Sequence, residues 1–196
     1  LTGVHWLAAS ADELHAVQEL SQKRCLPIHV YLGIPVELLQ HLVGLGLITG
    51  FGNERVKLGF VKFFADGSLG GHTAALNEPY SDKPETMGVM LYTQRRLNRL
   101  ILVVHRAGLQ VAVHAIGDRA LTMVLDAYKK ALKRFPRGNH RHRIEHCSVI
   151  TPGLIKRMKH LGIIASVQPH FIVSDFWVSR RVGAQRARWV YPFRSL

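Results

Sequence analysis

The sequence has few cysteines and no long hydrophobic run. Among its 196 residues only Cys25 and Cys147 are cysteines, which is too few for a disulfide framework. We therefore expect the reducing environment of the cytoplasm. The longest apolar run, 100–104, is followed by His105 and Arg106 and is too short to cross a bilayer. The sequence accordingly predicts a globular protein without a membrane partner.

Negative charge is also scarce. Lys and Arg number 26 against 13 Asp and Glu, so the net charge is +13, and the basic residues gather in 129–143 and 180–188. Such clusters can contact phosphate groups. The first cluster, however, follows the pattern of a helix and the loop after it, where lysines normally face solvent. The chain has neither zinc-finger spacing nor basic segments interleaved with stacking aromatics, so nucleic acid is not an expected partner.

Strand-like and helix-like segments alternate along the whole chain. The segments 27–32, 60–65, 109–114, 143–146 and 163–167 have the short apolar or β-rich pattern of strands. Amphipathic segments separate them, and the spacing of Ser10 and Glu13 is typical of a capping box at a helix start. Alternation of this kind predicts a mostly parallel sheet with right-handed crossovers.

A doubly wound sheet and a (β/α) barrel both satisfy this alternation. A dinucleotide fold would need G-x-G-x-x-G in its first turn, and the sequence lacks it. Polar residues at several strand ends favour the rim of a barrel, but a complete barrel needs about 250 residues. We therefore predict an α/β fold, a partial TIM-like (β/α) barrel of about five parallel strands that lacks the first and last barrel strands. We expect one domain over 1–196, cut from a longer chain.

The glycine-rich segment 66–89 is too long for an ordinary connection and is expected to be functional or lid-like.

Two histidines end neighbouring predicted strands. His114 closes the run 109–114 and His146 closes 143–146. A single histidine at a strand end more often satisfies backbone groups. Two at equivalent ends of successive parallel strands converge on one edge of the sheet, and neutral imidazole is a good ligand for zinc and similar ions. The pair therefore indicates a metal site.

Lys62 lies inside an apolar strand, where an ammonium group is costly to desolvate. Its amine could extend to the rim or pair with an acid. Alternatively, burial lowers its pKa, so that the neutral amine captures carbon dioxide and becomes an anionic bridging ligand. Strand alternation places Lys62 and Asp66 on the same side.

Several segments together resemble a known superfamily. The stretch 61–70 (VKFFADGSLG) is followed in order by 73–76, 78–80, 114–120 (HAIGDRA), 141–146 (RHRIEH), 165–169 (ASVQP), 174–175 and 191–196. This pattern resembles the central signature of the amidohydrolase superfamily, in the branch of N-substituted formamide deformylase-like proteins. The resemblance extends over nearly the whole chain.

The resemblance implies a distorted TIM barrel with one or two divalent metal ions, usually zinc, and hydrolysis of C–N bonds in small amide-type substrates by metal-activated water. By position, Lys62 corresponds to the metal-bridging, often carboxylated lysine, and His114 and His146 correspond to the two later histidine ligands. Four further positions are candidates for substrate binding: Asp66, His72, Asp118 and Gln168. Asp118 could equally cap the helix after it, and His72 could simply be an exposed loop residue.

The sequence also departs from that superfamily. The His-x-His pair expected upstream of Lys62 and the strand-end aspartate expected after 163–167 are missing, and that aspartate would be the general base. The catalytic residues therefore stay unassigned, and the chain is expected to hold about half of an active site. An alternative is a non-catalytic remnant whose open sheet edges drive homo-oligomerisation or binding of a partner.

Overall fold

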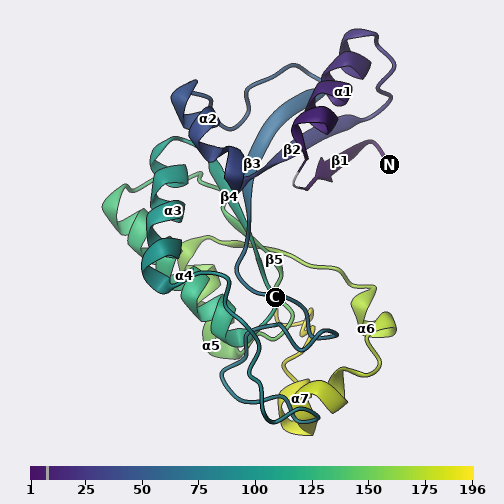
Figure 1. Ribbon diagram of the computed structural model, residues 1–196, viewed down its shortest axis with the longest axis vertical. Helices are drawn as coiled ribbons and strands as arrows, with labels where there is room; N and C mark the ends of the chain where they lie inside the picture. Colours follow the sequence, from purple (N-terminus) through teal and green to yellow (C-terminus); the bar gives the residue numbers. More distant parts are fainter. Residues whose placement is uncertain (8) are drawn as a thin grey trace. The chain divides into compact units, whose positions relative to one another are not determined.

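A computed structural model describes residues 1–7 and 9–196 (Figure 1). The chain divides into two compact units. Unit 1 comprises Leu1–Phe63 and Val103–Ala112, and unit 2 comprises Phe64–Leu102 and Val113–Leu196.

Unit 1 contains the first three strands with their helices. Its elements are β1 (Gly3–Trp6), α1 (Ala11–Gln22), β2 (His29–Pro35), the 3-10 turn η1 (Val36–Leu38), α2 (Leu39–Gly44), β3 (Val56–Phe64) apart from its last residue, and the beginning of β4 (Gln110–Ala115). The strands β1 and β2 pair in parallel from Gly3 opposite His29, and β2 pairs in parallel with β3. The predicted capping box starts α1, because Ser10 Oγ accepts from the Glu13 amide and Glu13 Oε2 accepts from the Ser10 amide.

Unit 2 continues the alternation. Its elements are most of α3 (Gln94–Arg106), the end of β4, α4 (Asp118–Arg134), β5 (Arg143–His146), α5 (Pro152–Leu161), β6 (Ile164–Ser166), α6 (Phe171–Ser174) and α7 (Val178–Ala187). The strands β5 and β6 pair in parallel, with Arg143 opposite Ile164. The helices α4 and α5 lie side by side (Figure 1).

The predicted fold class is confirmed. Within the described residues the sheet has six strands in the order β1-β2-β3-β4-β5-β6, so each strand is added beside the one before it, as in a (β/α) barrel. The strand β1 was not predicted, because Gly3–Trp6 is only four residues long, is mostly exposed and lacks an apolar run. The strand β3 begins at Val56, four residues before the predicted segment 60–65, because the exposed Lys57 interrupts the apolar pattern near its start. None of the described helices is long and apolar enough to cross a membrane.

The segment 66–89 is a packed excursion with its own small core. Leu69, Leu76 and Tyr80 from this segment pack with Ile116 at the end of β4 and with Val182 of α7. The loop is therefore fixed against the strand ends of unit 2, and this packing positions the candidate site residues within and beside it.

Gly117 is one of the glycines that this packing requires. It is the N-cap residue of α4, and a Cβ atom there would overlap the carbonyl group of Ala75. We expect Gly117→Ala to destabilise the protein by at least about 2 kcal/mol, because a backbone carbonyl cannot move aside as a flexible side chain would.

The matched control is Gly44→Ala at the end of α2, where a Cβ atom meets nothing within 4 Å. This variant should be neutral or up to about 1 kcal/mol more stable, since alanine is the better helix former. Urea denaturation measures the stability of both variants. Equal denaturation midpoints for Gly117→Ala and Gly44→Ala would show that the close contact of Gly117 with Ala75 does not matter for stability.

Candidate metal and substrate site

The two predicted histidines come together in unit 2. His114 lies near the end of β4 and His146 ends β5, and their ring centroids are 4.5 Å apart with the ring planes at 70°. Both side chains are partly accessible to solvent. Two imidazoles at this separation are close enough to coordinate the same metal ion after small side-chain adjustments.

Hydrogen bonds set the tautomer of each ring. His114 Nε2 lies 2.9 Å from the carbonyl oxygen of Gly67, which can only accept, so Nε2 is the donor in this hydrogen bond. His146 Nδ1 lies 2.7 Å from Oε1 of Gln168, which can only accept, so in this ring Nδ1 is the donor. The Gln168 amide is oriented by its own Nε2, which donates to the carbonyl of Ser166 at 3.5 Å. Acceptors of this kind are what orient histidine ligands in metal sites, so the pair fits a divalent ion.

The backbone turns sharply at His146. His146 and Cys147 both have left-handed conformations, with φ of 75° and 50°, which is uncommon for residues with side chains. The ring of Phe171 lies parallel to that of His146 at a centroid distance of 6.2 Å. Gln168 and Phe171 therefore both hold the imidazole that this strained turn presents.

Asp66 joins the loop to the end of β4. Its Oδ1 accepts from the amide of Ile116 at 3.0 Å, and its Oδ2 accepts from the amides of Ala75 and Gly117 at 2.8 Å. Its Oδ1 also lies 3.6 Å from His114 Nε2. Burial raises the pKa of the carboxyl to about 6, while the three amides act in the opposite direction. With 2% of its surface exposed, Asp66 has the geometry of a positioning residue, and its contact with substrate stays a prediction.

Asp118 has a similar joining role. Its Oδ1 accepts from the amide of Asn77 at 2.9 Å and its Oδ2 from the Asn77 side-chain amide at 2.8 Å. Gly117, and not Asp118, occupies the N-cap position of α4. The Asp118 carboxylate still contributes to the start of the helix, because its Oδ1 accepts from the amide of Arg119 at 3.0 Å. The carboxylate is thus used to hold the loop against the start of α4.

His72 is not simply an exposed loop residue. Its Nε2 lies 3.0 Å from Asp82 Oδ1 and 2.6 Å from an Arg181 guanidinium nitrogen, and its ring meets Tyr80 edge-on. The side chain is 18% exposed. These partners belong to the loop 66–89 and to α7, so His72 fixes one to the other.

Lys62 lies on β3 in unit 1. It is 3% exposed, and its Nζ donates to the carbonyl of Phe63 at 3.2 Å. The lysine is therefore buried in an apolar strand, as the sequence predicted.

Across residues 1–7 and 9–196, no group of three or more His, Cys, Asp or Glu side chains is arranged to hold a metal ion, so His114 and His146 stand as a pair.

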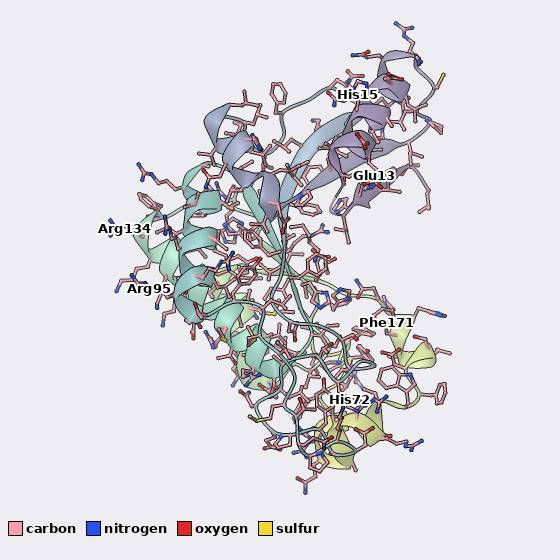
Figure 2. The ribbon with its side chains drawn as sticks, in the orientation of Figure 1. Glu13, His15, His72, Arg95, Arg134 and Phe171 are labelled. Atoms are coloured by element: carbon pink, nitrogen blue, oxygen red, sulfur yellow. The ribbon has the colours of Figure 1, made fainter. Side chains whose placement is uncertain are left out.

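Unit 2 also contains an aromatic cavity that no sequence motif indicated, and Phe171, which packs against His146, is one of its walls. It has a volume of about 270 Å³, and its walls include Leu69, Ile116, Phe171, Asp175, Trp177 and Tyr191. Figure 2 marks Phe171 at the beginning of α6. These residues come from three distant segments, so no local pattern connects them. The concentration of aromatics in 171–193 was the one signal that could have indicated the cavity.

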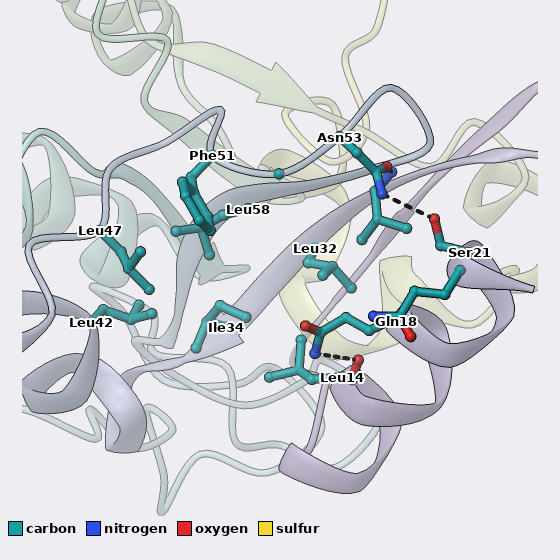
Figure 3. A pocket seen from close by; sticks show the side chains of 13 residues that line it. Leu14, Gln18, Ser21, Leu32, Ile34, Leu42, Leu47, Phe51, Asn53 and Leu58 are labelled. Atoms are coloured by element: carbon teal, nitrogen blue, oxygen red, sulfur yellow. Dashed lines mark hydrogen bonds between the residues drawn. The ribbon is translucent and has the colours of Figure 1, made fainter.

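Unit 1 has a separate apolar pocket of about 370 Å³ between α1, β2 and the segment 42–58 (Figure 3). Leu14, Leu32 and Phe51 are among its lining residues, and Asn53 donates to Ser21 at its edge. The residues predicted for the site do not line it, so it is distinct from the strand-end pair.

Fold and site together define a partial (β/α) barrel that carries polar side chains at its strand ends. The chain belongs to the Amidohydrolase family, whose model it matches over residues 1–196. This agrees with the superfamily that the motifs indicated.

The similarity extends to curated and solved relatives. A putative amidohydrolase YtcJ of Bacillus subtilis is 44% identical over 143 residues, covering 72% of this chain and 26% of that protein. The crystal structure of an uncharacterized metal-dependent hydrolase from Pyrococcus furiosus superposes with a TM-score of 0.90 at 38% identity, covering all of this chain and 40% of that one. The chain thus spans well under half the length of these relatives.

The narrower branch is not established. The N-substituted formamide deformylase of Arthrobacter pascens is 27% identical over 143 residues, covering 70% of this chain and 25% of that protein. This distant similarity supports the family and leaves the branch as a proposal.

We expect Asp66→Asn to destabilise the protein by about 2 kcal/mol or more. In either orientation of the new amide, at least one buried backbone N–H loses its acceptor, and each such loss costs about 1–3 kcal/mol. Urea denaturation at neutral pH measures the change.

Asp126→Asn is the control, because the Asp126 carboxylate is 45% exposed and pairs with Arg157 at the surface. Loss of such a pair costs less than about 1 kcal/mol. Similar destabilisation by both substitutions would mean that Asp66 does not hold the loop.

Proposed function

We propose that the protein to which this chain contributes is a hydrolase that cleaves the C–N bond of a small amide-type molecule with metal-activated water. The observation that carries the proposal is the pair His114 and His146, whose rings lie 4.5 Å apart at neighbouring strand ends, each with one nitrogen held by an oxygen acceptor. Membership of the Amidohydrolase family and similarity to a metal-dependent hydrolase support it.

The proposed cofactor is one or two divalent metal ions, with zinc as the first candidate because imidazole suits it. His114 through Nδ1 and His146 through Nε2 would hold the ion, and Lys62 would bridge as a carbon dioxide adduct. Such an adduct keeps one N–H, which can still donate to the carbonyl of Phe63. When bound, the metal lowers the pKa of a coordinated water toward about 7 and polarises the substrate carbonyl.

The remaining candidates position this arrangement. Gln168 accepts a hydrogen bond from Nδ1 of His146 and so orients that ring. Asp66 fixes the loop 66–89, and the Gly67 carbonyl of this loop orients His114. Asp118 and His72 hold the loop 66–89 to α4 and α7. We propose that Asp66, His72, Asp118 and Gln168 are the residues nearest to bound substrate. We also propose that the substrate is an amide with a substituted nitrogen, as the formamide deformylase-like pattern implies. A cytoplasmic location is proposed from the low cysteine content alone.

Metal analysis tests the proposal directly. His114→Ala and His146→Ala should each reduce the bound zinc by at least tenfold after dialysis against a weak chelator, because each removes one of two paired ligands. Elemental analysis of the purified protein gives the metal content per chain.

His15→Ala is the matched control, since His15 is an exposed residue of α1 that pairs with Glu19 at 3.2 Å (Figure 2). It should keep the full metal content. Unchanged metal content in both site variants would reject the proposal, and a defined oligomer without metal would favour the non-catalytic remnant instead.

The role of Lys62 has its own test. Protein equilibrated with ¹³C-labelled bicarbonate should show a carbamate carbonyl signal by NMR that is lost in Lys62→Met, a substitution that keeps the length and apolar stem of the side chain. Lys57→Met on the same strand, where the lysine is exposed, should keep the signal. A signal that persists in Lys62→Met would contradict the bridging role.

A further inference from the structure

The aromatic cavity of unit 2 is connected to the histidine pair through residues that contact both. Phe171 forms part of its wall and lies parallel to the ring of His146. Ser68, another wall residue, follows Gly67, whose carbonyl holds His114. A molecule that reacted at the pair and extended past Phe171 would reach this cavity.

The walls of the cavity are mostly apolar rings. Phe171 and Tyr191 meet edge-on at a centroid distance of 6.0 Å, and Trp177 adds a third ring. Leu69 and Ile116 complete the apolar surface. A volume of about 270 Å³ is ample, since a cavity of about 150 Å³ already holds benzene.

One carboxylate interrupts this apolar lining. Among the described residues that line the cavity, Asp175 is the one that carries a full charge. Its Oδ2 accepts from the Tyr191 hydroxyl at 2.5 Å, and its Oδ1 accepts from Ser174 at 3.2 Å. Burial and the neighbouring Asp175 raise the pKa of Tyr191, so the phenol stays protonated and fixes the carboxylate at the wall.

The nearby guanidinium does not cancel this charge. Arg181 lies 5.5 Å from the centroid of the Trp177 ring, but it is already paired with the carboxylate of Asp82. A fixed carboxylate among three aromatic rings is therefore left in a chain whose net charge is +13.

Aromatic faces and a carboxylate both attract cations, and the rings do so best when the cation is poorly hydrated. We propose that this cavity is a substrate subsite for an organic ammonium group carried on an aromatic or other apolar body. The description as a substrate subsite rests on the proposed function, whereas the binding of such a cation does not. The amide substrate would then bear a protonated amine at the end remote from the bond that is cleaved.

The test uses two probes of the same shape. Benzylamine is protonated at neutral pH and benzyl alcohol is not, so their affinities for the full polypeptide isolate the charge. Calorimetry with the metal removed by chelation should give an affinity for benzylamine at least tenfold higher than for benzyl alcohol. Because neither metal nor turnover enters this measurement, its failure is distinguishable from failure of the proposed hydrolysis.

Asp175→Asn locates the effect. It should weaken benzylamine binding at least tenfold and leave benzyl alcohol within twofold. Asp12→Asn makes the same charge change at an exposed position of α1 and should alter neither affinity. If Asp175→Asn does not fold, the NMR signal of the Trp177 indole N–H in the unaltered protein replaces it, and benzylamine should shift that signal at lower concentration than benzyl alcohol.

Equal affinities for the two probes, or equal losses of both in Asp175→Asn, would overturn the cationic subsite in favour of a neutral apolar one. Failure of both probes to bind, or an indole signal that neither probe moves, would overturn the subsite altogether.

Discussion

The buried carboxylate of Asp66 is the interaction on which the rest of unit 2 depends. Its two oxygens accept from three backbone amides that belong to the loop 66–89, the end of β4 and the start of α4. The loop carries the Gly67 carbonyl that sets the tautomer of His114, and it contributes Leu69 to the aromatic cavity. A carboxylate that is 2% exposed is stable there only because each oxygen has these partners.

A second constraint acts at the end of β5. His146 takes a left-handed conformation, and its ring is held by Gln168 through a hydrogen bond and by Phe171 through parallel packing. Backbone strain of this kind persists only where the surroundings over-determine the conformation, and such positions are concentrated at functional sites. The same Phe171 is a wall of the cavity, so the segment after β6 links the metal-ligand candidates to the proposed subsite for the rest of the substrate.

Much of the fold could be predicted because its signals are local. The capping box of Ser10 and Glu13, the buried face of α4 and the strand that ends at His146 follow from residue types at fixed spacing. The strand β1 could not be predicted, since Gly3–Trp6 gains its regular structure from pairing with β2 and not from a hydrophobic pattern. His114 and His146 were predictable as a pair because the carboxyl ends of adjacent parallel strands lie at one edge.

The sequence by itself determined the alternation of strands and helices, the family motifs, and which imidazoles and which lysine are candidates for a metal. Only the tertiary structure decided which nitrogen of each ring is held, that Asp66 and Asp118 bind backbone amides of the loop, and that Phe171, Asp175 and Tyr191 surround one cavity. The physical reason is the range of the interactions. Caps and periodic burial act within one element, whereas hydrogen-bond acceptors and cavity walls are supplied by segments that only the packed chain brings together.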